Sequence, residues 1–186
     1  MKLVLIRHGQ TIGNLKKRYI GTTDEPLCEE GKTALQTKKF PAADIVIASP
    51  MKRCIETAKL IYPDRIPVLY NGLQECDFGD FEGKNYFELN NNADYQKWIE
   101  SKGTGCFPDG EHPEHFKHRC LCAFEECVNT YSFAESIAFV VHGGTIMSIL
   151  EKYSRPRKSY YDFQIENGCG YVGIFDGESI RIAEEI

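Results

Sequence analysis

Residues 3–11 read LVLIRHGQT, and the first four of them are all apolar. Such a short apolar run is typical of a β-strand that is buried on both faces of a sheet. Arg7 and His8 follow at once, so the run is too short for the core of a signal peptide or for a membrane span. The sequence therefore predicts a buried strand that ends in a charged turn containing Gly9.

Two further apolar runs have the same character. They are residues 45–48 (IVIA) and 137–141 (IAFVV), and apolar residues at helical spacing follow each of them. Ser49-Pro50 predicts an N-cap and a first-turn proline for the helix after the first of these runs. Glycine-containing turns at Gly9 and Gly143 are expected to open the helices that follow the other two strands.

The remaining segments complete the pattern. Residues 113–131 place apolar side chains on one helical face, and residues 171–183 contain an Asp176-Gly177 turn between two strand-like runs, which predicts a hairpin. Strands that alternate with helices indicate an α/β fold with a mainly parallel central sheet, and the hairpin is expected to add an antiparallel edge.

The composition narrows the class of protein. The chain has 186 residues, of which 42% are hydrophobic and 26% are charged, and its formal charge is -5. These values are typical of a globular chain, and we expect one domain over residues 1–186. The acidic balance argues against a nucleic acid or a membrane surface as partner. We expect a cytoplasmic protein whose eight cysteines are reduced.

Basic side chains follow all three predicted buried strands. Arg7 and His8 end the first strand, Arg53 follows the second, and His142 ends the third. Ligands of open α/β sheets bind beyond the carboxyl ends of the strands, so these side chains are expected to meet at one edge. Two guanidinium groups, two imidazoles and the amides of a helix start suit a phosphate group.

This set of residues also suggests a reaction. A neutral imidazole can attack phosphorus to give a phosphohistidine, while the other basic groups stabilise the phosphoryl oxygens. A carboxylic acid would then protonate the leaving oxygen. Residues 75–83 (ECDFGDFEG) hold four candidates, and the chemistry alone does not choose among Glu75, Asp77, Asp80 and Glu82.

The same residues resemble a known family. Arg7-His8-Gly9-Gln10-Thr11 with Asn14 is similar to the signature of the histidine phosphatase superfamily, the phosphoglycerate mutase-like proteins. Further blocks follow in the family's order over most of the chain: Gly21-Thr22, Ser49-Pro50 with Arg53, Glu75, Phe81-Glu82-Gly83, and His142-Gly143-Gly144. The resemblance implies a three-layer α/β/α fold.

The resemblance also implies roles for individual residues. His8 would be the phosphorylated nucleophile, and Glu75 would be the general acid. No cofactor and no metal are implied. The phosphate pocket would be made by the side chains of Arg7, Arg53, His142 and Asn14 and by the backbone of Gly21 and Gly143.

The family contains proteins of three kinds, and the sequence favours one. Mutases of the family usually carry segments that cover the site, whereas the 24 residues between Gly83 and Pro108 contain no arginine and are expected to leave it uncovered. A phosphatase is therefore favoured over a phosphoglycerate mutase-type phosphotransferase and over a silent phospholigand-binding protein. Its substrate would be a small phosphate ester. Residues 75–83, Tyr95, Trp98 and Gly168-Cys169 resemble α-ribazole 5'-phosphate phosphatases, and sugar phosphates remain alternatives.

A second cluster raises the question of a metal. His115, His118 and Cys122 lie at helical spacing, so a zinc ligand set is geometrically possible. The spacing matches no common ligand pattern, which favours solvated histidines instead. The sequence leaves the oligomeric state open.

Overall fold

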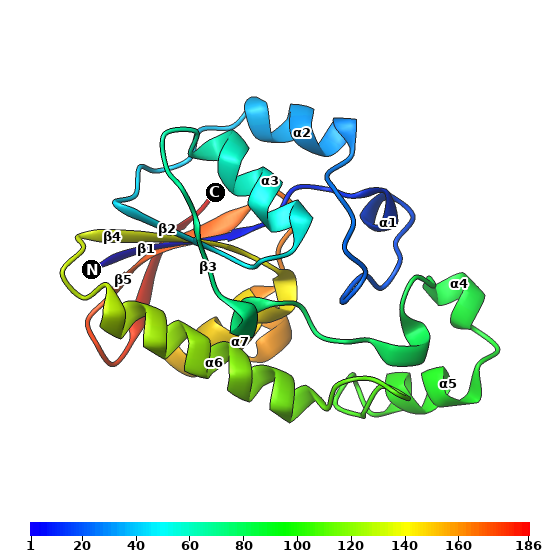
Figure 1. Ribbon diagram of the computed structural model, residues 1–186. Helices are drawn as coiled ribbons and strands as arrows, with labels where there is room; N and C mark the ends of the chain where they lie inside the picture. Colours follow the sequence, from blue (N-terminus) through cyan, green and yellow to red (C-terminus); the bar gives the residue numbers. More distant parts are fainter.

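A six-stranded sheet forms the centre of the computed structural model, which describes all residues from 1 to 186 (Figure 1). Its strand order is β3-β2-β4-β1-β5-β6. The strands from β3 to β1 are parallel to one another, and β5 is antiparallel to both of its neighbours, β1 and β6. The predicted mainly parallel sheet with an antiparallel hairpin at its edge is confirmed. The strands are β1 (Lys2–Arg7), β2 (Ile45–Ala48), β3 (Val68–Leu69), β4 (Ser136–Val141), β5 (Gly170–Phe175) and β6 (Ile180–Glu185).

The first strand of the chain lies in the middle of this sheet. Lys2 of β1 pairs with Ser136 of β4 on one side and with Ile174 of β5 on the other. Side chains alternate between the faces of a strand, and both faces of β1 are covered. Leu3 and Leu5 therefore belong to one buried cluster, and Val4 and Ile6 belong to another.

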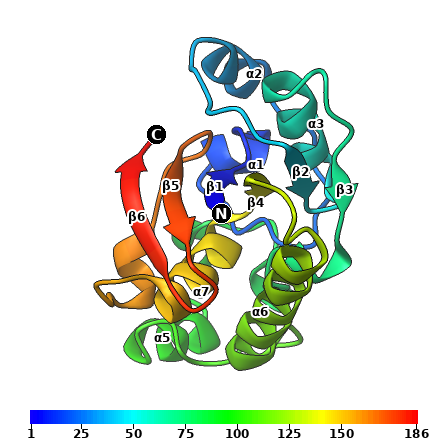
Figure 2. The same ribbon diagram turned by 90° about the vertical axis from the view of Figure 1, so that its left-hand side faces the viewer.

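Helices cover both faces of the sheet, as a three-layer α/β/α fold requires (Figures 1 and 2). On one face, α2 and α3 lie over the sheet, and Ala58 of α3 packs against Val4 and Val46. On the other face, Phe124 of α6 and Ile146 of α7 join the larger core cluster. The helices are α1 (Ile12–Leu15), α2 (Glu29–Gln36), α3 (Lys52–Ile61), α4 (Tyr86–Leu89), α5 (Ala93–Glu100), α6 (Pro113–Thr130) and α7 (Gly143–Tyr153), with 3-10 turns at Asn71–Leu73, Gly79–Phe81 and Tyr160–Phe163.

Two of the expected helix starts are wrong. The helix after β2 begins at Lys52, its N-cap is Met51, and the Ser49 side chain does not cap it. The helix after β1 begins at Ile12, where the hydroxyl of Thr11 accepts the N–H of Asn14, rather than at Gly9. In both places a turn separates the strand from the helix. Ser49 in one turn contacts His142, and the carbonyl oxygen of Gly9 in the other accepts a hydrogen bond from His8. Gly143 opens α7 as expected.

The short helices α4 and α5 lie beyond the carboxyl ends of the parallel strands (Figure 1). An aromatic cluster attaches them to the rest of the molecule, and its members include Phe81, Tyr95, Phe107 and Phe116. No helix combines the length and the apolar character that a membrane crossing demands.

Candidate active site

Two histidine rings meet where β1 and β4 end. The centroids of the His8 and His142 rings lie 5.2 Å apart, and both residues are buried. The backbone N–H of His8 donates to Val141 O at 2.9 Å, so the parallel pairing of the two strands fixes this juxtaposition.

The surroundings of His8 leave one ring nitrogen free. Nδ1 lies 2.7 Å from the carbonyl oxygen of Gly9, which can only accept, so Nδ1 carries the proton and Nε2 keeps its lone pair. Burial, together with the positive charges of Arg53 and Arg7, lowers the pKa of His8 well below its usual range. His8 is therefore a neutral imidazole with a free Nε2.

Two guanidinium groups flank the histidines, and Arg53 is fully buried whereas Arg7 is half-buried. Arg53 on α3 donates to the carbonyl oxygens of Thr23 and Gly21, both at 2.8 Å, and Arg7 donates to Ile165 O at 2.6 Å. The Nε–H groups of both arginines are nevertheless buried without a partner. Unpaired buried donors are costly, and a bound anion would satisfy them.

Glu75 is the acid that reaches this site. Its carboxylate accepts the N–H of Cys76 at 3.0 Å and that of Gly144 at 3.2 Å, and a side chain at Gly144 would collide with it. Burial raises the pKa of Glu75, which favours the protonated form that a general acid needs.

The other three candidate acids have different surroundings. Asp77 accepts the N–H of Gly79 at 2.9 Å, and Asp80 is exposed. Glu82 accepts the N–H groups of Gly21 and Thr23 at 2.7 and 2.9 Å. The structure therefore distinguishes Glu75, which the chemistry of the sequence could not.

The remaining predicted site residues differ in position. Asn14 and Gly143 line the same cavity as Arg7, His8 and Glu75, whereas Arg53 and His142 are fully buried and are not part of its lining. Gly21 is not part of the lining. Its N–H donates to Glu82 and its carbonyl oxygen accepts from Arg53, so in this structure it supports the guanidinium group.

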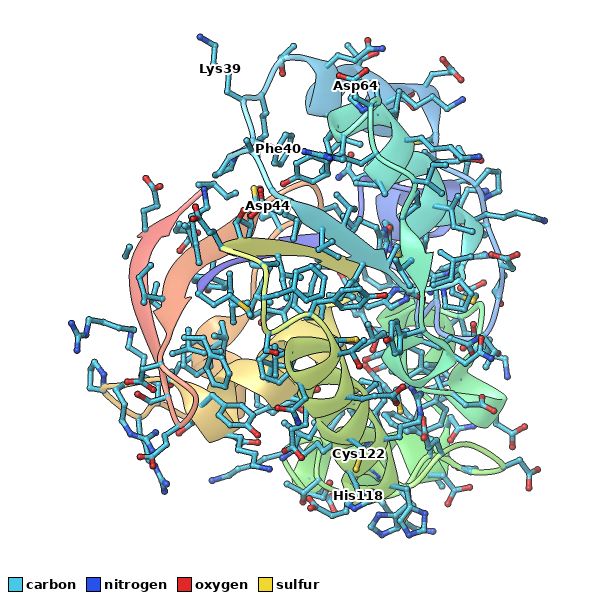
Figure 3. The ribbon with its side chains drawn as sticks, turned by 60° about the vertical axis from the view of Figure 1, so that its left-hand side comes forward. Lys39, Phe40, Asp44, Asp64, His118 and Cys122 are labelled. Carbon is cyan, nitrogen blue, oxygen red and sulfur yellow. The ribbon has the colours of Figure 1, made fainter.

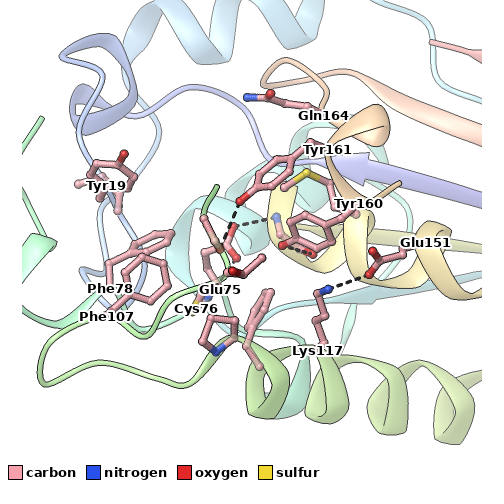
Figure 4. Close-up of a pocket in the computed structure, with 18 of the residues that line it drawn as sticks. Tyr19, Glu75, Cys76, Phe78, Phe107, Lys117, Glu151, Tyr160, Tyr161 and Gln164 are labelled. Atoms are coloured by element: carbon pink, nitrogen blue, oxygen red, sulfur yellow. Dashed lines mark hydrogen bonds and ion pairs between the residues drawn. The ribbon is translucent and has the colours of Figure 1, made fainter. Parts of the chain in front are cut away.

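The cavity has a volume of about 510 Å³ and a strongly aromatic wall. In Figure 4, Phe78 and Phe107 stand on one side of Glu75, and Tyr160 and Tyr161 stand on the other. The seven aromatic residues of the lining are Tyr19, Phe78, Trp98, Phe107, Phe116, Tyr160 and Tyr161.

The segment between Gly83 and Pro108 contributes to this cavity, contrary to the expectation that it leaves the site uncovered. Trp98, Lys102, Gly103 and Thr104 form part of the lining, and the Tyr161 hydroxyl approaches Gly103 O at 3.5 Å. Short helices can thus form a wall without a long insertion.

Two of the four lysine and arginine residues that line the cavity are paired with acids. Nη2 of Arg18 lies 3.0 Å from Oε1 of Glu88, and Nζ of Lys117 lies 2.9 Å from Oε2 of Glu151. Such pairs reduce the positive charge that a second phosphate group would meet.

The comparison with known proteins decides the family. The sequence profile of the Histidine phosphatase superfamily (branch 1) matches residues 3–184. This chain belongs to the histidine phosphatase superfamily.

Relatives within the histidine phosphatase superfamily carry several names. The adenosylcobalamin/alpha-ribazole phosphatase of Salmonella typhimurium is 29% identical, over 91% of this chain and 88% of that protein. A broad-specificity phosphatase of Saccharomyces cerevisiae is 33% identical, over 81% and 69% respectively. A 2,3-bisphosphoglycerate-dependent phosphoglycerate mutase of Gloeobacter violaceus is 32% identical, over 80% and 73%.

Solved structures give the same family and fold. The alpha-ribazole phosphatase from Shigella flexneri superposes with a TM-score of 0.85 at 25% identity, covering 98% of this chain and 95% of that one. A phosphoglycerate mutase from Thermus thermophilus superposes with a TM-score of 0.78 at 26% identity, covering 100% and 98%. The phosphoglycerate mutase-like, three-layer fold is confirmed.

Three side chains of this histidine phosphatase domain support the site and were missed in the sequence. Arg119 donates to Gly72 O, Gln74 O and Glu75 O and pairs with Glu111, so it holds the segment that carries Glu75. Asn167 donates to His8 O, and Thr57 accepts the N–H of Gly9. A helical arginine or threonine has no local sequence signal that indicates which carbonyl or amide it will meet.

The histidine-rich region of α6 lies apart from this site. His118 and Cys122 sit together on the outer face of α6, with Sγ 3.7 Å from Nε2 (Figure 3). Nowhere do three His, Cys, Asp or Glu side chains gather closely enough to hold a metal ion.

Proposed function

We propose that this chain is a phosphomonoester hydrolase that works through a phosphohistidine at His8. One observation carries the proposal: a neutral His8 with a free Nε2 lies beside two guanidinium groups whose buried Nε–H donors are unpaired. A nucleophile and an anion site are thereby combined at one edge of the sheet.

The reaction would proceed in two steps. Arg7, Arg53 and His142 hold the phosphoryl group while Nε2 of His8 attacks phosphorus and the ester P–O bond breaks. Glu75 gives its proton to the leaving oxygen, and the alcohol departs. Glu75, now a carboxylate, takes a proton from a water molecule that attacks the phosphohistidine, which releases phosphate and restores His8.

The proposed substrate is α-ribazole 5'-phosphate or a similar small phosphate ester. The names of the Salmonella and Shigella relatives support it, and an aromatic wall suits a substrate that carries a flat ring system. Sugar phosphates are the alternative, in keeping with the broad-specificity relative from yeast.

Phosphate release should exceed phosphate rearrangement. A mutase keeps a bisphosphate in its site, and here the ion pairs Arg18–Glu88 and Lys117–Glu151 reduce the positive charge available to the second phosphate. We expect release of inorganic phosphate from α-ribazole 5'-phosphate, and little conversion of 3-phosphoglycerate to 2-phosphoglycerate with 2,3-bisphosphoglycerate present. Faster interconversion than release would favour the mutase, and a protein that neither releases phosphate nor becomes phosphorylated would be a silent binding protein.

The reaction is also expected to need no divalent metal. Arg7 and Arg53 already supply donors and positive charge to the phosphoryl oxygens, and His142 supplies a further donor. Initial rates measured after exhaustive treatment with a chelator should equal those of the untreated protein. Restoration of a lost activity by zinc or magnesium would refute this expectation.

The pH dependence should reflect His8 and Glu75. His8 attacks only when neutral, and its lowered pKa keeps it neutral well into the acidic range. Glu75 acts only when protonated, so kcat for an alkyl phosphate should fall as the pH rises through the raised pKa of Glu75. For p-nitrophenyl phosphate, whose leaving group needs no proton, this alkaline decline should be much weaker. Identical profiles for the two substrates would argue against Glu75 as the acid.

A further inference from the structure

Ser49 lies at the end of β2, where the sequence predicted a helix cap. Its side chain is fully buried, and Oγ lies 2.8 Å from Nε2 of His142. The hydroxyl therefore contacts a ring that stands 5.2 Å from the ring of His8. No role of Ser49 follows from the reaction steps given above.

The partners of this hydroxyl determine where its proton goes. Ser49 Oγ also accepts the N–H of Met51 at 3.4 Å. The Cys54 thiol is a further neighbour of the hydroxyl, but burial raises the pKa of this thiol, so it keeps its proton and is only a weak acceptor. Nε2 of His142 is then the acceptor within reach of the hydroxyl proton. A ring nitrogen that accepts a hydrogen bond carries no proton, so the proton of the neutral His142 ring lies on Nδ1.

The two histidines are thus held in opposite ways. His8 donates from Nδ1 to Gly9 O and keeps a free lone pair on Nε2. In His142, Nε2 faces Ser49 Oγ at 2.8 Å and Cys54 Sγ at 3.6 Å, whereas Nδ1 has only a distant contact, 3.9 Å from Cys54 Sγ. One ring is left as a nucleophile and the other as a hydrogen-bond donor.

We propose that Ser49 is a positioning residue that holds His142 as the Nδ1–H tautomer, so that His142 donates to the phosphoryl group. This inference rests on the proposed function. With the opposite tautomer, His142 would turn a lone pair toward the anionic oxygens and repel them. The neutral hydroxyl of Ser49, which directly follows β2, therefore decides whether His142 attracts or repels the phosphoryl oxygens.

The tautomer can be measured directly in the resting wild-type protein. Nitrogen-15 NMR distinguishes a protonated ring nitrogen from an unprotonated one, and the His142 signals are identified by their loss in His142→Gln. We expect a protonated Nδ1 and an unprotonated Nε2 in wild type, and a mixture of both tautomers in Ser49→Ala. A wild-type ring protonated on Nε2 would overturn the proposal, and this measurement requires no variant of Ser49 to fold.

Kinetics then show whether the tautomer matters for the reaction. Ser49→Ala should lower the rate of His8 phosphorylation by about tenfold to a hundredfold, as expected for partial loss of a preorganised donor. Ser49→Thr, which keeps a hydroxyl, should retain most of the rate. The matched control is Ser136→Ala at the other end of β4, where another buried serine hydroxyl is hydrogen-bonded, to Asp44. It should leave both the tautomer and the rate unchanged.

The outcomes separate this inference from the proposed function. A slower Ser49→Ala whose His142 tautomer equals that of wild type would overturn the inference and leave the hydrolase intact. A wild-type protein that never becomes phosphorylated would reject the hydrolase, whereas the NMR result would still test how Ser49 holds the ring.

Discussion

Replacing His8 with alanine should abolish both turnover and covalent phosphorylation of the protein. Its Nε2 is the free nucleophilic nitrogen beside the arginines, and removal of a nucleophile typically costs a factor of roughly a thousand or more in kcat. The test uses a phosphate-labelled substrate and a quench in base during turnover. Phosphohistidine resists base and is lost in acid, so the label should be present in wild type and absent from His8→Ala.

The matched control for His8 is His115→Ala on the exposed side of α6. This change removes an imidazole that lies outside the cavity, so turnover and labelling should equal those of wild type. Base-stable label that persists in His8→Ala would place the nucleophile elsewhere.

Replacing Glu75 with glutamine should reduce activity in a way that depends on the leaving group. Glutamine keeps an oxygen that can accept the N–H of Cys76 or Gly144 but has no proton to donate to an alkoxide. For an alkyl phosphate such as α-ribazole 5'-phosphate we expect a fall in kcat of about a hundredfold to ten-thousandfold. For p-nitrophenyl phosphate the fall should be within about tenfold, because the phenolate leaves unaided.

Asp80→Asn provides the comparison for this experiment. It removes a carboxylate from the same acidic segment, at an exposed position outside the cavity. Its rates on both substrates should match those of wild type. Equal losses on both substrates in Glu75→Gln would instead assign Glu75 a role in binding or folding.

The elements that the sequence predicted well are those with strong local patterns. The apolar runs at residues 3–6, 45–48 and 137–141 became central strands, because a segment buried on both faces must be apolar throughout. The meeting of His8 with His142 followed from the same pattern, since parallel strands bring their carboxyl ends to one edge.

Other features depend on contacts between distant segments, which no local pattern encodes. Ser49-Pro50 is a good helix start by composition, but tertiary structure uses the Ser49 hydroxyl for His142 instead. The aromatic wall draws Tyr19, Trp98 and Tyr160 from separate segments, so the sequence could not group them. Likewise, the contacts that set Glu75 apart from the other three acids come from Gly144 and Arg119, which are both far from it in the sequence.

The central position of β1 in the sheet has a consequence for how the protein folds. The partners of β1 (Lys2–Arg7) are β4 at residues 136–141 and β5 at residues 170–175. The apolar strand that precedes His8 can therefore pair only with segments that lie far along the chain. Pairings so distant along the chain are slow to form. The edge at which His8 meets His142 therefore forms late in folding, because it exists only once β1 has paired with β4.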